Sequence, residues 1–252
     1  MLRLLTIEFH KLKHNKASKI LSLIYFGLLI CIALTAAIKF DVGPIKFHLA
    51  EMGIFNFPYI WHFNTYVAAI LKFFLLLVIV SMMANEYSYK TLKQNLIDGL
   101  SKKEFILSKF YTVVAFALAS TFFVFITSLI LGLIYSDYNE FAIITSDLTY
   151  FLAFFIKLIG YFSFGLFLGI LVKRSAFAVG AMLVWYFIEW IIFGILGWKF
   201  VSWETAQSIK NFLPLEAMSN LIKEPGSRLG AVRSIANQIG ETFTKTYAVE
   251  FS

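Results

Sequence analysis

The sequence predicts an all-α fold, a polytopic bundle of transmembrane helices, and three observations support this class. Sixty per cent of the 252 residues are apolar and only 15% are charged, whereas soluble domains carry about 25% charge. Five apolar runs are each long enough for a helix that crosses a hydrocarbon core about 30 Å thick. The basic residues lie between these runs, not clustered on one soluble face as nucleic-acid binding would require. The net charge of +7 therefore indicates membrane topology, and no nucleic-acid partner is expected.

Residues 1–19 are expected to form an interfacial N-terminal helix. Leu2, Leu5, Phe9 and Leu12 recur at three- and four-residue steps among basic residues, which is typical of a helix lying along a membrane surface. A disordered basic tail is the alternative. The apolar run that follows is longer than the roughly 7 to 15 residues of a signal peptide, so we expect it to be a retained membrane anchor.

Residues 20–198 form the predicted transmembrane domain. Backbone polar groups in lipid must pair within their own segment, so each apolar run is expected to be a helix. Three of the runs contain a single charged residue, which is Lys72, Lys157 or Glu189. The expected spans are 20–38, 60–83, 110–135, 150–172 and 177–198.

The distribution of basic residues predicts the orientation. Twelve Lys and Arg residues precede the first span or lie in the second-to-third and fourth-to-fifth connections, whereas the other two loops contain only Lys39 and Lys46. Cytoplasmic loops hold the excess of basic residues, so the N-terminus is expected in the cytosol. By alternation, residues 199–252 are expected outside as an extracytoplasmic amphipathic helical stretch, with short helices at 203–213 and 215–222 on either side of Pro214.

The longest cytosolic connection, residues 85–109, is predicted to be ordered. Ser101 can cap a helix whose Glu104 stands three residues later, the pattern of a capping box. Gly99 can end the preceding helix in a left-handed turn. Two short helices that meet at a tight turn would give a rigid element that another protein could grip.

This segment resembles the cytosolic signature of the type-2 ABC transporter permeases, the ABC-2 family. It departs from that signature at Lys90, Gly99 and Lys102, where the family has Gly, Pro and Arg. The residues that match are Glu86, Thr91, Leu92, Leu96, Ile97, Leu100, Ser101, Leu107, Ser108 and Lys109.

The resemblance implies a coupling helix between spans two and three that docks in a cleft of a separate ABC ATPase subunit. It implies that Glu86 anchors the segment by charge, that Thr91 hydrogen-bonds its turn, and that Leu92, Leu96 and Leu100 fill the ATPase groove. It further implies a permease of the bacterial cytoplasmic (inner) membrane that pairs with a second permease subunit as a homodimer or heterodimer. Because the family usually has six spans, a sixth is expected beyond Ser252.

The chain has no G-x-x-x-x-G-K-[ST] phosphate loop. It is therefore expected not to be an enzyme and to hold no cofactor, with ATP and Mg²⁺ bound in the partner subunit. The many Phe and Tyr side chains fit export of a lipid-like or amphiphilic substrate, with membrane lipid as a further partner. Two alternatives remain open from sequence. One is an ion- or proton-coupled secondary carrier that uses the intramembrane Lys and Glu, and the other is a membrane scaffold subunit of a secretion or motility machine.

The three intramembrane charges are predicted to lie in one layer, about 20 to 24 Å from the cytosolic helix ends at about 1.5 Å per residue. One acid and two bases at matched depth suggest an ion pair. Lys157 with Glu189 is the first choice and Lys72 with Glu189 the second. The alternatives are lysines that snorkel separately to the outer interface, or a carrier site.

Gly165 and Gly169 form a G-x-x-x-G pattern in the fourth span. Such spacing lets two helices approach closely. We expect helix packing within one subunit rather than dimerisation.

Overall fold

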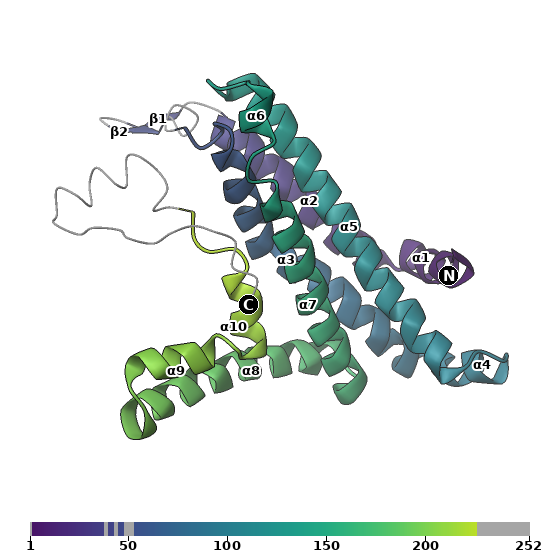
Figure 1. Cartoon of the computed structure of the whole chain (residues 1–252). Coiled ribbons are helices and arrows are strands. Elements are labelled where there is room, and N and C mark those ends of the chain that lie inside the picture. The colour runs from purple at the N-terminus through teal and green to yellow at the C-terminus, as the bar shows by residue number, and fades with distance from the viewer. Residues whose placement is uncertain (1, 38–39, 43–44, 48–52, 226–252) are drawn as a thin grey trace.

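A computed structural model of the chain describes residues 2–37, 40–42, 45–47 and 53–225. Figure 1 shows long helices gathered into a bundle, with shorter helices at its ends. In chain order the elements are α1 (Leu2–His14), α2 (Lys16–Ala37), β1 (Phe40–Val42), β2 (Ile45–Phe47), α3 (Tyr59–Ser88), α4 (Thr91–Ile97), α5 (Lys102–Tyr135), α6 (Phe141–Ile144), α7 (Thr149–Val172), α8 (Ser175–Ile195), the π-helical turn η1 (Leu196–Phe200), α9 (Trp203–Lys210) and α10 (Pro214–Asn220).

The all-α transmembrane bundle is confirmed. Within the described residues, five helical segments are long and apolar enough to cross a membrane. The strands β1 and β2 pair antiparallel, with Phe40 opposite Phe47, and the sequence analysis did not predict this short hairpin. The five segments are Lys16–Leu34, Tyr59–Ser88, Lys102–Tyr135, Phe141–Val172 and Ser175–Phe200.

The boundary between α1 and α2 lies at Asn15, earlier than the predicted start of the first span. The Asn15 side-chain oxygen accepts hydrogen bonds from the backbone N–H groups of Ala17, at 2.9 Å, and Ser18, at 3.3 Å. An Asn side chain that satisfies the first free amides of a helix is a strong start signal. Residues 16–19 therefore belong to α2, and the first helix ends at His14.

Helix α3 is the centre of the bundle, and α2, α5, α7 and α8 all pack against it. Its buried side chains include Trp61, which is fully buried and stacks on Phe125 of α5. Some of the polar groups inside are paired between helices, as in the hydrogen bond between Tyr25 of α2 and Ser120 of α5. Such pairing is required where no water can satisfy a polar group.

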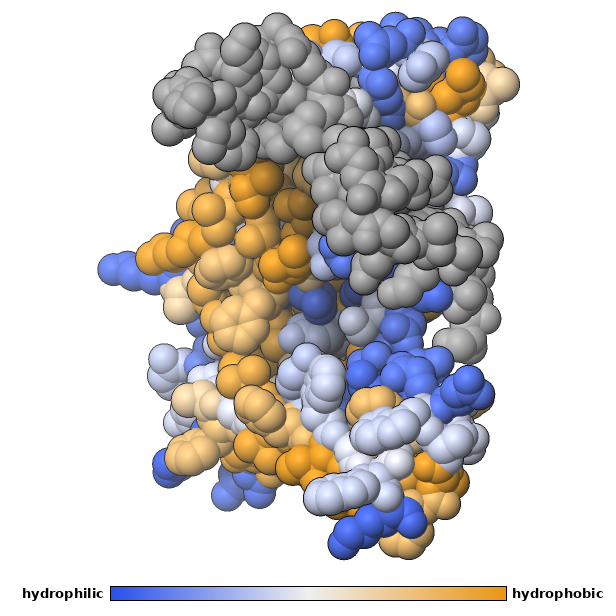
Figure 2. All heavy atoms as spheres, turned by 90° about the vertical axis from the view of Figure 1, so that its left-hand side faces the viewer, coloured by the Kyte–Doolittle hydropathy of each residue, from blue (hydrophilic) through white to orange (hydrophobic). Residues whose placement is uncertain are grey.

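Helix α8 departs from this arrangement. In Figure 1 it diverges from the bundle near the end of α7, with α9 lying beside it. Only Ala178, Met182 and Glu189 of this helix are buried, so most of its apolar surface is uncovered. Figure 2, which views the molecule from the left-hand side of Figure 1, shows a further broad hydrophobic area above the level of α8. Apolar surface of this extent in a membrane protein faces lipid or another subunit.

Helices α9 and α10 are shorter than the two helical stretches predicted between residues 203 and 222. Ser202 caps α9 by accepting a hydrogen bond from the Thr205 backbone N–H at 3.3 Å, and Pro214 occupies the first turn of α10. Helix α10 packs on α7 and α8. The remainder of the stretch, residues 226–252, and the expected sixth span lie outside the described residues.

Candidate functional site

A cluster of charged side chains joins three helices at the end of the bundle that carries α4. We call it the Glu86 cluster, and it comprises Glu8 and Lys11 of α1, Glu86 of α3 and Lys109 of α5. Lys109 donates to Glu86 Oε1 and to Glu8 Oε2, each at 2.6 Å. Lys11 donates to Glu86 Oε1 at 2.7 Å.

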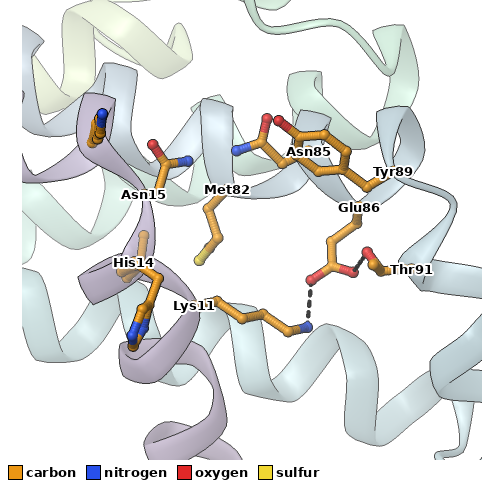
Figure 3. Close-up of a pocket in the computed structure, with 10 residues that line it drawn as sticks. Lys11, His14, Asn15, Met82, Asn85, Glu86, Tyr89 and Thr91 are labelled. Atoms are coloured by element: carbon orange, nitrogen blue, oxygen red, sulfur yellow. Dashed lines mark hydrogen bonds and ion pairs between the residues drawn. The ribbon is translucent and has the colours of Figure 1, made fainter.

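The second carboxylate oxygen of Glu86 binds α4. Glu86 Oε2 accepts from the Thr91 hydroxyl and from the Asn95 side-chain amide, the latter at 3.4 Å. Figure 3 shows the Glu86 carboxylate between the Lys11 ammonium and Thr91. One carboxylate thus connects α4 to α1 and α5, which agrees with the predicted anchoring by charge, although Thr91 bonds Glu86 rather than its own turn.

Burial makes this cluster energetically important. The side chains of Glu8 and Glu86 are 3% exposed and that of Lys109 is 1% exposed. Two acids and two bases balance one another in charge, although the Lys11 side chain is 36% exposed. Removing one member would leave an uncompensated buried charge, which typically costs about 3–5 kcal/mol.

The backbone around α4 is fixed by its caps. Lys90, which stands where the family has Gly, adopts a left-handed conformation with φ 56°. Gly99 has φ 92°, as the predicted left-handed turn requires. Ser101 and Glu104 form the predicted capping box at the start of α5. Helix α4 is therefore a single short helix between two sharp turns.

The apolar side chains of α4 and of the residues beside it divide into two groups. Leu92 and Leu100 pack partly buried against the core of this chain, and Leu96 is also half-buried. The strongly exposed apolar side chains are Ile97, at 78%, and Tyr89, at 75%. The face open to another protein is thus centred on Ile97, which the sequence analysis had matched to the family without giving it a contact role.

Two cavities lie on either side of the Glu86 cluster. One, of about 410 Å³, is bordered by the α1–α2 corner, the end of α3 and Thr91. The other, of about 540 Å³, lies between α1 and the α4–α5 connection, bordered by Gly99 and Leu100 among others. Lys11 contributes to both. Lys11 of α1 and Thr91 and Asn95 of α4 all bind Glu86, so the two helices are linked through this carboxylate of α3.

The predicted intramembrane ion pair is wrong. Within the described part of the chain, Glu189 pairs with neither Lys157 nor Lys72. Instead, Glu189 and Lys157 both bind backbone groups in and beside α10. Glu189 accepts from the backbone N–H groups of Leu215, at 2.9 Å, and Glu216, at 3.0 Å. The Trp185 indole donates a third hydrogen bond to Glu189 at 2.9 Å.

Lys157 binds the other end of α10. Its ammonium donates to the carbonyl oxygens of Ser219, at 3.1 Å, and Ile222, at 3.5 Å. Helix starts have free N–H groups and helix ends have free carbonyls, so an acid at the start and a base at the end satisfy both. Lys157 and Glu189 are 5% and 2% exposed. Neither charged group is therefore stabilised by solvent, and Lys157 does not snorkel to the outer interface.

Lys72 has a different environment. It donates to the Ala69 carbonyl of its own helix at 2.8 Å and lies over the Tyr161 ring, 4.5 Å from the centroid. No carboxylate of a described residue forms an ion pair with it. Among the three intramembrane charges, Lys72 alone remains available to an anionic group from outside the chain.

The two glycines of α7 have the predicted role. A Cβ at Gly165 would lie 2.3 Å from Leu76 Cδ1 of α3, and one at Gly169 would lie 3.5 Å from Met83 Cβ of the same helix. Both glycines thus face α3 of the same chain, where the lack of a Cβ lets the two helices approach closely.

Sequence reasoning missed Glu8 and Lys11 as members of the cluster. Glu8 lies three residues after Leu5 and four before Leu12, so it belongs to the apolar face of α1. An acid on an apolar helix face needs a buried basic partner. That spacing was the available signal, and the partner, Lys109, lies 101 residues away in the chain.

Five apolar spans, a buried cluster of ion pairs and a short helix, α4, held at the end of the bundle define a polytopic α-helical membrane protein. The chain belongs to the ABC-2 family: the model described as "ABC-2 family transporter protein" matches residues 4–189, more than half of the chain. Comparison with curated proteins and with solved structures yields no match. Membership makes the chain the permease of an ABC transporter and implies association with an ABC ATPase.

Proposed function

We propose that this permease exports a lipid-like or amphiphilic substrate from a bacterial cell, driven by a separate ATPase subunit that binds ATP and Mg²⁺. In this proposal α4 is the coupling helix, its end of the bundle faces the cytosol with the N-terminus, and the membrane is the cytoplasmic (inner) membrane. The observation that carries the proposal is the Glu86 cluster, since it ties α4 to three other helices.

The contacts of Glu86 suggest how a movement of α4 would be transmitted. The ATPase would press on the exposed face around Ile97. Because Thr91 and Asn95 are bound to Glu86, displacement of α4 would pull on the end of α3. Lys11 and Lys109 would then carry the displacement to α1 and α5.

In this proposal a second permease subunit packs against the exposed apolar surface of α8. Its exposed side chains include Phe187, at 63%, and Ile191, at 58%. A homodimer or heterodimer would place the seam between the two subunits along this apolar surface, and substrate would pass through that seam. Membrane lipid would cover whatever area the second subunit leaves.

The environment of Lys72 supports the proposal that the substrate is amphiphilic. An ammonium group in the apolar part of a membrane, without a carboxylate partner among the described residues, favours an anionic group on the ligand. The surrounding aromatic and aliphatic side chains would contact an apolar tail. By contrast, Glu189, the acid that a proton-coupled carrier would use, is fully engaged with backbone N–H groups. Family membership also disfavours the carrier and the scaffold.

The test uses Ile97→Asp, with Phe141→Asp as the matched control at the opposite end of the bundle. Both side chains are strongly exposed, at 78% and 81%, so neither change should disturb folding. Leu100 is unsuitable because it is partly buried and packs against the core of this chain. Ile97→Asp should release the co-expressed ATPase and abolish permease-dependent ATP hydrolysis, since a charge replaces an apolar anchor.

Phe141→Asp should retain both ATPase binding and hydrolysis. If Ile97→Asp also retains them, α4 is not the docking element and the proposed coupling is wrong.

A further inference from the structure

The cavity of about 410 Å³ between the α1–α2 corner and the end of α3 has the polarity of an anion site. Two side-chain amides border it. Figure 3 shows Asn15 and Asn85 facing one another across this space, from α1–α2 on one side and from α3 on the other.

The orientation of the Asn15 amide is fixed by the fold. Its oxygen accepts from the Ala17 and Ser18 backbone N–H groups, so its NH₂ group must point away from α2 and toward the cavity. Within the described residues, neither the Asn15 nor the Asn85 NH₂ group donates to another residue. The cavity therefore presents free donors from both of its walls.

Charge on the cavity wall favours an anion as well. Glu86 is the carboxylate that borders the cavity, and both of its oxygens are already occupied by donors from this chain. Lys16 stands exposed at the rim, and no described carboxylate pairs with it. Lys11 uses one N–H on Glu86, which leaves donor capacity for a further group.

The position of the cavity selects between sources of the anion. Helix α1 carries its apolar and basic residues on different faces, and α2 is a membrane span that begins at Lys16. The corner between them thus lies at the level of lipid headgroups. Leu12 and Met82, which are both buried, supply an apolar side to the same cavity.

We propose that this cavity binds the headgroup of an anionic membrane phospholipid, with the phosphate between Asn15 and Asn85 and additional attraction from Lys11 and Lys16. Bound there, the lipid bridges the α1–α2 corner to the end of α3, next to the Glu86 cluster. The site is independent of the transported substrate and of the ATPase.

The binding experiment uses the purified full chain in detergent, without the ATPase. Native mass spectrometry and thermal unfolding are followed on titration with phosphatidylglycerol, phosphatidylcholine or inorganic phosphate. Phosphatidylglycerol should bind and raise the unfolding temperature, whereas the other two should do so weakly. Equal stabilisation by phosphatidylcholine would exclude selection for an anionic lipid, and equal stabilisation by inorganic phosphate would identify a free-anion site instead.

Variants on both walls locate the site. Asn15→Asp keeps the oxygen that caps α2 but replaces the donor with a negative charge. Asn85→Asp replaces the donor on the opposite wall, in α3, with a negative charge. Each should weaken phosphatidylglycerol binding by about tenfold or more, because a carboxylate would face the phosphate. Lys13→Gln is the control, since Lys13 is an exposed residue of α1 that does not border the cavity and the change removes the same unit of charge.

Lys13→Gln should change the affinity by less than about twofold. If all three variants weaken binding equally, the lipid is held by the overall surface charge and the proposed site does not exist. If both Asp variants bind phosphatidylglycerol as tightly as the natural protein while remaining folded, the cavity is not where the lipid binds.

Discussion

Lys90 is a residue whose backbone conformation is better suited to another amino acid. Its φ of 56° lies in the left-handed region, where a Cβ costs roughly 1–2 kcal/mol. Lys90→Gly removes this cost and restores the residue of the family pattern, although glycine gains entropy in the unfolded chain. We expect the free energy of unfolding to rise by about 0.5–1 kcal/mol, measured by denaturation in detergent.

Lys93→Gly is the control for that change, because Lys93 lies within α4 and is exposed. There, glycine should lower the free energy of unfolding by about 1 kcal/mol. A loss of stability in Lys90→Gly would show that the Lys90 side chain contributes more than its backbone costs.

Lys157 and Glu189 bind the two ends of α10 and not each other. Reversing both charges should therefore have the opposite outcome to the one that an ion pair would predict. Glu189→Lys places an ammonium against the N–H groups of Leu215 and Glu216 and should strongly reduce the yield of folded protein. Adding Lys157→Glu should not restore it, because that carboxylate would face the carbonyls of Ser219 and Ile222. Size-exclusion chromatography of both variants measures the yield, and recovery in the double variant would favour direct pairing.

At the scale of helices, the contact between α3 and α7 depends unequally on the two glycines of α7. Gly165→Ala forces Leu76, which is buried, to move, since the new Cβ would approach its Cδ1 to 2.3 Å. Gly169→Ala makes only ordinary contacts, the nearest at 3.5 Å. Alanine is the better helix former by about 1 kcal/mol. Gly169→Ala should thus be more stable than the natural protein, and Gly165→Ala less stable than Gly169→Ala, in thermal unfolding.

The Glu86 cluster makes α1 and α5 unequally dependent on their lysines. Lys109 is 1% exposed and pairs with both carboxylates, whereas the Lys11 side chain is 36% exposed. Lys109→Met should therefore cost about 3–5 kcal/mol, because it leaves two buried acids short of one base. Lys11→Met should cost less, since water can replace part of its interaction. Chemical denaturation compares the two, and equal losses would contradict the burial argument.

Local signals in the sequence were sufficient for some elements and not for others. The capping box of Ser101 and Glu104 and the turn at Gly99 depend on residues within a few positions, so they could be predicted. The partners of Glu189 could not, because they are backbone groups 26 and 27 residues further along the chain. Helix α10 folds back against α7 and α8, and the hydrophobic periodicity of those two helices does not indicate this contact.

For the whole molecule, the orientation in the membrane remains a prediction from the basic residues, and the single cysteine makes it testable. Cys31 can be replaced by Ser, and one cysteine then added at Lys103, near the start of α5, or at Tyr138, beyond its other end. A membrane-impermeant maleimide applied to intact cells should label Tyr138→Cys and leave Lys103→Cys unlabelled until the membrane is opened. The reverse pattern would invert the topology and with it the proposed docking side of α4.

The way α10 is held has a consequence for how the protein is made. Lys157 and Glu189 leave the ribosome before residues 214–222 do, so each enters the translocon without the groups that later satisfy it. A lysine at the centre of a span costs roughly 2.5–3.5 kcal/mol on insertion. Spans α7 and α8 must therefore be carried into the bilayer by their apolar neighbours alone, and α10 completes them only afterwards. Docking of α10 is thus the step of assembly at which the buried charges of α7 and α8 gain their hydrogen-bond partners.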